Sequence, residues 1–285
     1  MIRLSTFEDN SFEPFKNLTK EQYDYLQKDG NLIKSTYKQF VVFKYLQLNL
    51  NDYFKFIEKW TNVPNNGMIV LSTHVVFILE VNKLLLNVLI AFKFFLDNAE
   101  TYLKRKYNKD SQIVENYTQL TRNIFDNSFA YRFLSKLRNY SAHLGFPLEY
   151  IHFDINFNHE NPELSTTSPQ LILNIESLKK EKDLFGKIVM QDLENWSGKL
   201  DLIPLIIELS HHIMTIQKYI YKSQKEELEE AIENIECFIE NKKTEKNQIK
   251  VYTLTERDGE TVTMNIYDVP CEIISEIKST TKNWS

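Results

Sequence analysis

The sequence predicts a mainly α-helical protein, built on a helical bundle with additional β-strands or hairpins and a long C-terminal helix. Only 6 Gly and 7 Pro interrupt the 285 residues, which favours long helices joined by few turns. Hydrophobic residues make up 42% of the chain and charged residues 26%, a composition typical of a packed core. In several segments the apolar residues recur with the 3.6-residue period of a helix.

Helices are expected from near the start of the chain. Thr19 and Gln22 stand at the spacing of a capping box, which predicts the start of a short helix, and Gly30 is its expected end. A second helix is expected over residues 35–60. The Asn-Asn-Gly run at 65–67 then predicts a turn.

The third expected helix is the longest, from about 71 to 107. Its apolar residues surround the axis over much of its length, which is typical of a helix buried among others. A bilayer span needs about 20 uncharged residues, whereas Glu80, Lys83 and Lys93 interrupt the most apolar stretch. We therefore expect a central core helix and no membrane contact.

Two shorter helices should follow. Ser111 can cap one that runs to about Ile124, and Ser128 can cap the next, which Gly145 and Pro147 end. In this last helix the apolar and small residues share one face at helical spacing. The core-facing stripe comprises Ala130, Phe133, Leu134, Leu137, Ser141 and Leu144.

The second half of the chain changes in character. Residues 149–157 alternate polar and apolar, which predicts a strand, with 170–175 as its expected partner. Residues 249–255 and 261–267 flank Asp258-Gly259, a strong hairpin signal.

Between these strands a long helix is expected from Pro204, a favoured first-turn residue, to about Asn241. The expected organisation is a helical bundle over 1–147, with its core at about 71–147. An α+β extension over 148–285 would follow, in which the strand pair, the long acidic helix and the hairpin lie.

The charge is unevenly distributed. A net charge of −5 argues against a broad surface that coats nucleic acid. Residues 100–147, however, carry eight basic and four acidic side chains, a local net charge of +4. This excess could attract phosphate, or it could simply form a solvated helix face.

Several function classes have no sequence support. Cys237 and Cys271 show no CxxC or zinc spacing, which indicates reduced thiols in a reducing cytosol. The glycine-rich loop of an NTPase or a dinucleotide-binding fold is missing from the sequence. The first residues do not resemble a targeting segment. We therefore expect a cytoplasmic protein without a cofactor or a metal site.

The helix after Ser128 carries the one pattern that suggests chemistry. Arg138 is followed by the polar Asn139, and His143 stands five positions after the arginine. Arginine is always charged and can hold phosphate oxygens bidentately, whereas histidine titrates near neutral pH and can transfer protons. On an ideal helix the two side chains point about 140° apart. They could act on one phosphate if the last turn relaxes, or if a symmetric dimer supplies a second copy.

This arrangement resembles the signature of the HEPN superfamily: an arginine, a polar residue, three further residues and a histidine, near the end of a helix in a bundle. The resemblance covers roughly residues 71–147. It implies a metal-independent endoribonuclease of a toxin or phage-defence type, with RNA as substrate and two motifs that face each other across a homodimer. A regulatory protein partner is a further expectation. Arg138 and His143 would be catalytic, and Asn139 would orient the phosphate or the histidine.

Three further residues are candidates for substrate binding. Tyr140 could stack on a base or pack in the core. Lys104 and Arg105 belong to a segment, 100–105, that resembles an acidic-basic motif on an earlier helix of some HEPN groups; alternatively, Glu100 and Lys104 form an i,i+4 ion pair. Some HEPN toxins carry a nucleotidylated tyrosine two residues after the histidine, where this chain has a glycine.

A different class of function remains open. Arg138 and His143 can also be surface residues at a helix end, since the helix dipole favours a histidine in the last turn. The chain would then be a non-catalytic helical module that binds a protein or a nucleotide.

Overall fold

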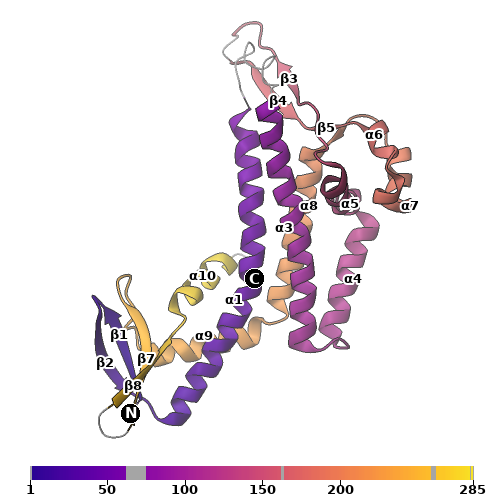
Figure 1. Cartoon of the computed structure of the whole chain (residues 1–285). Helices are drawn as coiled ribbons and strands as arrows, with labels where there is room; N and C mark the ends of the chain where they lie inside the picture. Colours follow the sequence, from indigo (N-terminus) through magenta and orange to yellow (C-terminus); the bar gives the residue numbers. More distant parts are fainter. Residues whose placement is uncertain (1, 62–74, 162–163, 258–260, 283, 285) are drawn as a thin grey trace. The chain divides into compact units, whose positions relative to one another are not determined.

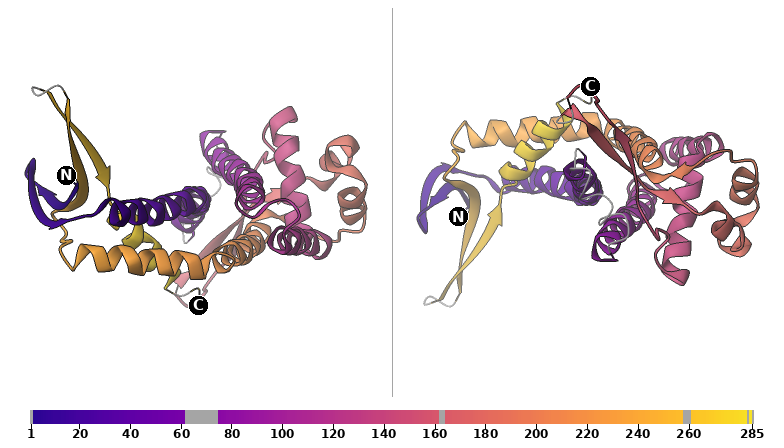
Figure 2. Two further views of the ribbon diagram at one scale, coloured as in Figure 1. Left: turned by 90° about the horizontal axis from the view of Figure 1, so that it is seen from below. Right: turned by 90° about the horizontal axis from the view of Figure 1, so that it is seen from above.

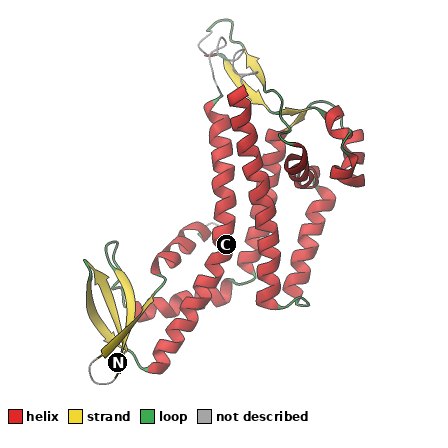
Figure 3. Ribbon diagram, in the orientation of Figure 1, coloured by secondary structure: helices red, strands yellow, loops and turns green. Residues whose placement is uncertain are grey.

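The fold is mainly α, as the sequence predicts. The computed structural model describes residues 2–61, 75–161, 164–257, 261–282 and 284. Within these residues the chain forms nine helices and three small antiparallel sheets (Figures 1 and 3).

The chain divides into two compact units. Unit 1 comprises Met1–Val41 and Tyr221–Ser285, and unit 2 comprises Val42–Ile220. The expected boundary after Pro147 is not where this division falls. Unit 1 instead joins the two ends of the chain, which no local sequence signal indicates.

Unit 1 contains a four-stranded antiparallel sheet of order β2-β1-β7-β8. The strands are β1 (Ile2–Glu8), β2 (Ser11–Asn17), β7 (Gln248–Arg257) and β8 (Thr261–Asp268). The hairpin expected near residues 249–267 is present as β7 and β8, although Asp258-Gly259 lies outside the described residues. The first two strands were not expected. Their turn is Asp9-Asn10, where both residues have the positive φ of a tight hairpin turn, 48° and 60°.

Helix α1 (Lys20–Lys59) begins as expected but does not end at Gly30. The capping box is present: the Thr19 N–H donates to Gln22 Oε1 at 3.0 Å, and the Gln22 N–H donates to Thr19 Oγ1 at 3.1 Å. The two helices expected over 19–30 and 35–60 are therefore one. At Gly30 a Cβ would lie 1.9 Å from Tyr267 Oη, so this glycine permits close contact with β8 and is not a helix stop.

The helix expected from Pro204 to Asn241 is two helices, α8 (Leu202–Lys222) and α9 (Lys225–Ile239). The periodicity continues across the break, which is why the sequence suggested one element. A further helix of unit 1, α10 (Cys271–Thr281), follows β8 directly and was not predicted.

The helices of unit 2 form a bundle. Its longest helix, α3 (Val75–Tyr107), contacts α4 (Gln112–Asn127) and α5 (Phe129–Leu144), and α8 packs on both of the shorter helices, as the end-on views also show (Figure 2). The second part of α1 runs antiparallel to α3, since Phe43 contacts Phe95 and Phe56 contacts Phe77.

Helix α3 is a core helix of this bundle. It is also long and apolar enough to cross a membrane by length and composition alone, but half of its most apolar window is buried inside the protein. Eleven of its residues, among them Leu85, Phe92 and Phe95, are buried. The expected start near residue 71 and the turn at 65–67 lie outside the described residues.

The segment after α5 forms two small sheets and two helices. β3 (His152–Asn156) pairs with β4 (Thr166–Gln170) and not with the expected 170–175, because residues beyond 170 pair elsewhere. β5 (Ile172–Leu173) pairs with β6 (Leu200–Asp201). Between them lie α6 (Ile175–Lys179) and α7 (Lys182–Glu194), and α7 packs against α5.

Candidate functional site

The start of α5 is held by polar contacts. Ser128 caps the helix by accepting a hydrogen bond from the Tyr131 N–H at 3.0 Å, and its hydroxyl donates to Glu208 on α8. Arg132 is only 8% exposed. Its Nε lies 3.0 Å from Asp192 Oδ2 on α7, and its Nη1 donates to two main-chain carbonyl oxygens at the end of α4, at 2.6 and 2.8 Å. Arg132 is thus a structural residue that joins three helices.

Aromatic contacts hold the middle of α5 against α7. The rings of Phe133 and Phe185 are stacked, with centroids 5.9 Å apart and an interplanar angle of 5°. Phe129 contacts Trp196 at 4.5 Å. These contacts, with the buried face of α5, fix the rotation of the helix and therefore the directions in which its other side chains point.

The end of α5 is held by a buried amide. Gly145, with a φ of 99°, ends the helix in a conformation that favours glycine. Three residues later, Leu148 exchanges two main-chain hydrogen bonds with the side chain of Asn82 on α3, at 2.8 and 3.2 Å. Asn82 is 2% exposed, so these bonds are shielded from water. The segment 138–143 therefore lies between two anchored points.

Arg138 differs from Arg132 although both belong to α5. Its side chain is half-buried, and its Nη1 donates to Asn139 Oδ1 at 3.1 Å. No carboxylate in the described part of the chain lies within ion-pair distance of it. A guanidinium carries five N–H donors, so most of those of Arg138 are free to bind an anion. This hydrogen bond ties Asn139 to the guanidinium of Arg138, whereas the expected role of Asn139 in orienting the phosphate or the histidine stays a prediction.

His143 is exposed on the last turn of α5. Within the described ranges its imidazole has no hydrogen-bond partner, and no contact joins it to Arg138. The two residues stand five positions apart on α5, a spacing at which side chains point about 140° apart on an ideal helix. Leu144, expected on the core-facing stripe, is instead 52% exposed; this expectation was wrong, because the buried face of α5 ends at Ser141 and residues 142–146 are exposed.

Tyr140 packs partly into the protein. Its ring lies 5.8 Å from that of Phe185, and partial burial, with the nearby carboxylates of Glu181 and Glu149, raises the pKa of its hydroxyl. The contact with Phe185 agrees with core packing. Stacking of Tyr140 on a base stays a prediction.

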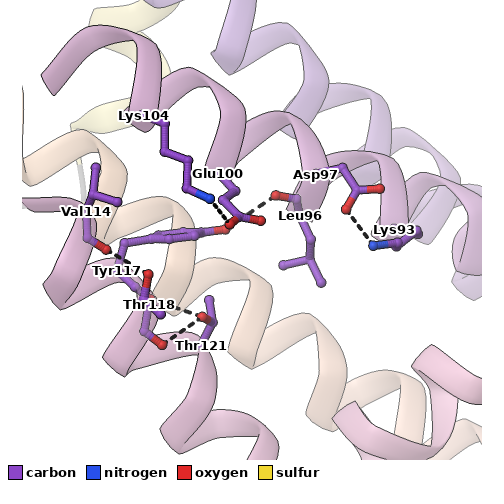
Figure 4. A network of polar contacts seen from close by, with 9 residues as sticks. All are labelled: Lys93, Leu96, Asp97, Glu100, Lys104, Val114, Tyr117, Thr118 and Thr121. Carbon is purple, nitrogen blue, oxygen red and sulfur yellow. Dashed lines mark hydrogen bonds and ion pairs between the residues drawn. The ribbon is translucent and has the colours of Figure 1, made fainter. Parts of the chain in front are cut away.

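Lys104 and Arg105 lie far from the motif. Lys104 forms the i,i+4 ion pair with Glu100, beside the hydrogen bond from Tyr117 to the main chain of Leu96 (Figure 4). Arg105 is exposed. Asn82, which contacts the segment just after the motif, is 22 residues from Lys104, or about 30 Å along α3. One chain therefore does not bring these two basic residues together with Arg138 and His143.

No metal centre is apparent. In the residues that the structure describes, no three His, Cys, Asp or Glu side chains gather in a way that could hold an ion. Cys237 and Cys271 are free thiols.

The residues that position the motif could not be found from local sequence patterns. Asp192 is 60 positions from Arg132, and Asn82 is 66 positions from Leu148, so no local spacing connects either pair. Asn82 is one of several polar residues on α3, so the sequence alone does not single it out.

Comparison with known proteins identifies no relative of this chain. No family model, no curated protein and no solved structure matches the chain. The resemblance to the HEPN superfamily rests on the motif and its helical setting.

Proposed function

We propose that the chain is a metal-independent endoribonuclease of the HEPN type, which acts on RNA in the cytoplasm as a toxin or phage-defence effector. The observation that carries the proposal is Arg138, a half-buried guanidinium with no carboxylate partner in the described chain, oriented by Asn139. An exposed histidine follows it on the last turn of the same anchored helix. A positive group held ready for an anion, close to an exposed proton-transfer group, suits a phosphodiester substrate.

The chemistry needs two histidines in different protonation states. A neutral His143 takes the proton of the ribose 2′-hydroxyl, whose oxygen attacks the adjacent phosphorus while the bond to the 5′-oxygen breaks. A protonated His143 from a second copy gives its proton to the leaving 5′-oxygen. Arg138 stabilises the negative charge that develops on the phosphoryl oxygens. The products are a 2′,3′-cyclic phosphate and a 5′-hydroxyl.

The surface beside the motif supports a homodimer. Leu144, Phe146 and Tyr150 follow His143 closely in sequence and are 52%, 46% and 41% exposed. Exposed apolar side chains near the motif are where we expect a second copy to bind. A second copy bound there would bring the second motif near the first, so that two arginines and two histidines surround one phosphate.

Expression of wild-type and variant protein in bacteria tests the proposal. Wild type should arrest growth and degrade RNA, whereas Arg138→Ala and His143→Ala should each remove both effects and Asn139→Ala should weaken them. Arg122→Ala and His211→Ala are matched controls, because both residues are exposed on other helices of unit 2. All variants should keep the helical circular-dichroism spectrum of the wild type.

If both motif variants degrade RNA as wild type does, the motif is structural and the proposal is wrong. The non-catalytic alternative, a helical module that binds a protein or nucleotide, would then be favoured.

A further inference from the structure

Unit 1 contains a cavity of about 400 Å³ where β7 begins and β8 ends. Lysines from three separate elements line it: Lys34 from α1, Lys243 from the segment between α9 and β7, and Lys250 from β7. The motif on α5 takes no part in it. Only two acidic residues, Asp268 and Glu272, are among its lining residues.

The three ammonium groups are held in place by nearby groups. Lys34 Nζ donates to the main-chain oxygen of Asp268 at 2.8 Å and lies 4.1 Å from the centre of the Tyr267 ring. Lys250 Nζ pairs with Asp268 Oδ1 at 2.7 Å. Lys243 Nζ donates to two carbonyl oxygens of its own loop. Because each ammonium has three N–H donors, all three lysines keep capacity for a ligand.

The electrostatic balance at the cavity favours an anion. One carboxylate, that of Asp268, pairs with one lysine, and its side chain is largely exposed to water. Partial burial lowers the pKa of Lys34, because this ammonium has lost part of its hydration. A negatively charged ligand would compensate for that loss.

The remaining walls supply further donors and apolar surface. α10 starts at the cavity with Pro270 as its first flanking residue, so no side chain caps it, and the N–H groups of Glu272 and Ile273 have no acceptor among the described residues. Ile249 and Val269 line the cavity with aliphatic carbon. The volume is within the range of small-ligand sites, about 300–1,000 Å³.

We propose that this cavity binds a small ligand that carries a phosphate or pyrophosphate group. Three convergent ammonium groups and free main-chain N–H donors suit an oxyanion with several oxygens, and the apolar wall gives its organic part a surface. The proposal is independent of the function proposed for the motif, since no residue is shared. It would give unit 1 the role of a ligand-binding unit.

Isothermal titration of the full-length protein with inorganic pyrophosphate, ATP and adenosine tests this proposal. Pyrophosphate and ATP should bind and adenosine should not, because the phosphates provide the contacts. Loss of one charge-assisted contact in Lys34→Met should weaken binding about tenfold or more. Lys38→Met is the matched control: Lys38 is exposed one turn further along α1 and does not line the cavity.

Lys243→Met provides a second variant in case Lys34→Met fails to fold, because Lys243 lies in a loop. It should weaken binding as well. If pyrophosphate and ATP do not bind wild type, the proposal is wrong. It is equally overturned if the cavity variants bind as tightly as the Lys38→Met control.

Discussion

Arg132 and Arg138 illustrate how far a single residue's role depends on its surroundings. They lie six positions apart on α5, and both belong to the basic segment 100–147. In the structure Arg132 is buried and bonded to Asp192 and to two carbonyl oxygens, whereas Arg138 bonds to its neighbour Asn139 alone among the described residues. The sequence pattern marks Arg138 as the candidate, and the contacts show that Arg132 is a structural residue whereas Arg138 keeps free N–H donors.

Arg132→Ala should destabilise the protein without removing a catalytic group. The change leaves Asp192 and two carbonyl oxygens without their donor, which should lower the free energy of unfolding by about 2–4 kcal/mol. Urea denaturation monitored by circular dichroism measures this, with Arg138→Ala for comparison. Arg138→Ala should change the free energy of unfolding by less than about 1 kcal/mol. Equal destabilisation by the two changes would contradict the distinction between them.

Among the helices and strands, sequence signals predicted the structure correctly where the contacts that determine an element lie within a few residues of each other. The capping box at Thr19 and the caps at Ser111 and Ser128 are present, because each needs hydrogen bonds over three residues only. β1 and the continuation of α1 through Gly30 were missed, because both depend on distant residues: Ile2 pairs with Thr253, and Gly30 contacts Tyr267.

Gly30→Ala tests whether Gly30 is present in α1 because of its close contact with Tyr267. Within a helix the change alone should add about 1 kcal/mol of stability from helix propensity. Here the new Cβ would lie 1.9 Å from Tyr267 Oη, so the variant should have a lower melting temperature than wild type. Tyr267→Phe removes the obstructing hydroxyl, which has no hydrogen-bond partner in the described part of the chain, and should restore stability in the double variant. A more stable Gly30→Ala single variant would contradict the close contact.

At the scale of the whole molecule, the activity proposed for α5 depends on a second copy. One chain presents one copy of the motif, and Lys104 lies about 30 Å along α3 from Asn82, the residue of α3 that contacts the segment just after the motif. The sequence suggests the dimer through the spacing of Arg138 and His143 on one helix and through the resemblance. The exposed apolar residues after His143 are the surface that we propose for that dimer.

Light scattering of the purified protein should therefore show a homodimer. Phe146→Glu places a charge on the apolar surface beside the motif and should produce a monomer that no longer cleaves RNA. Ile188→Glu is a matched control, since Ile188 is exposed on α7 outside this group. A stable wild-type monomer that cleaves RNA would exclude the composite site.

The proposed reaction is cleavage of RNA by Arg138 and His143 through the ribose 2′-hydroxyl, without a metal ion. The most direct measurement incubates the purified protein, in excess EDTA, with an RNA oligonucleotide and with the same oligonucleotide carrying one 2′-deoxy residue at the cut position. The account predicts full cleavage of the RNA, with 2′,3′-cyclic phosphate and 5′-hydroxyl ends, and no cleavage at the deoxy position. Loss of cleavage in EDTA, or equal cutting at the deoxy position, would contradict it.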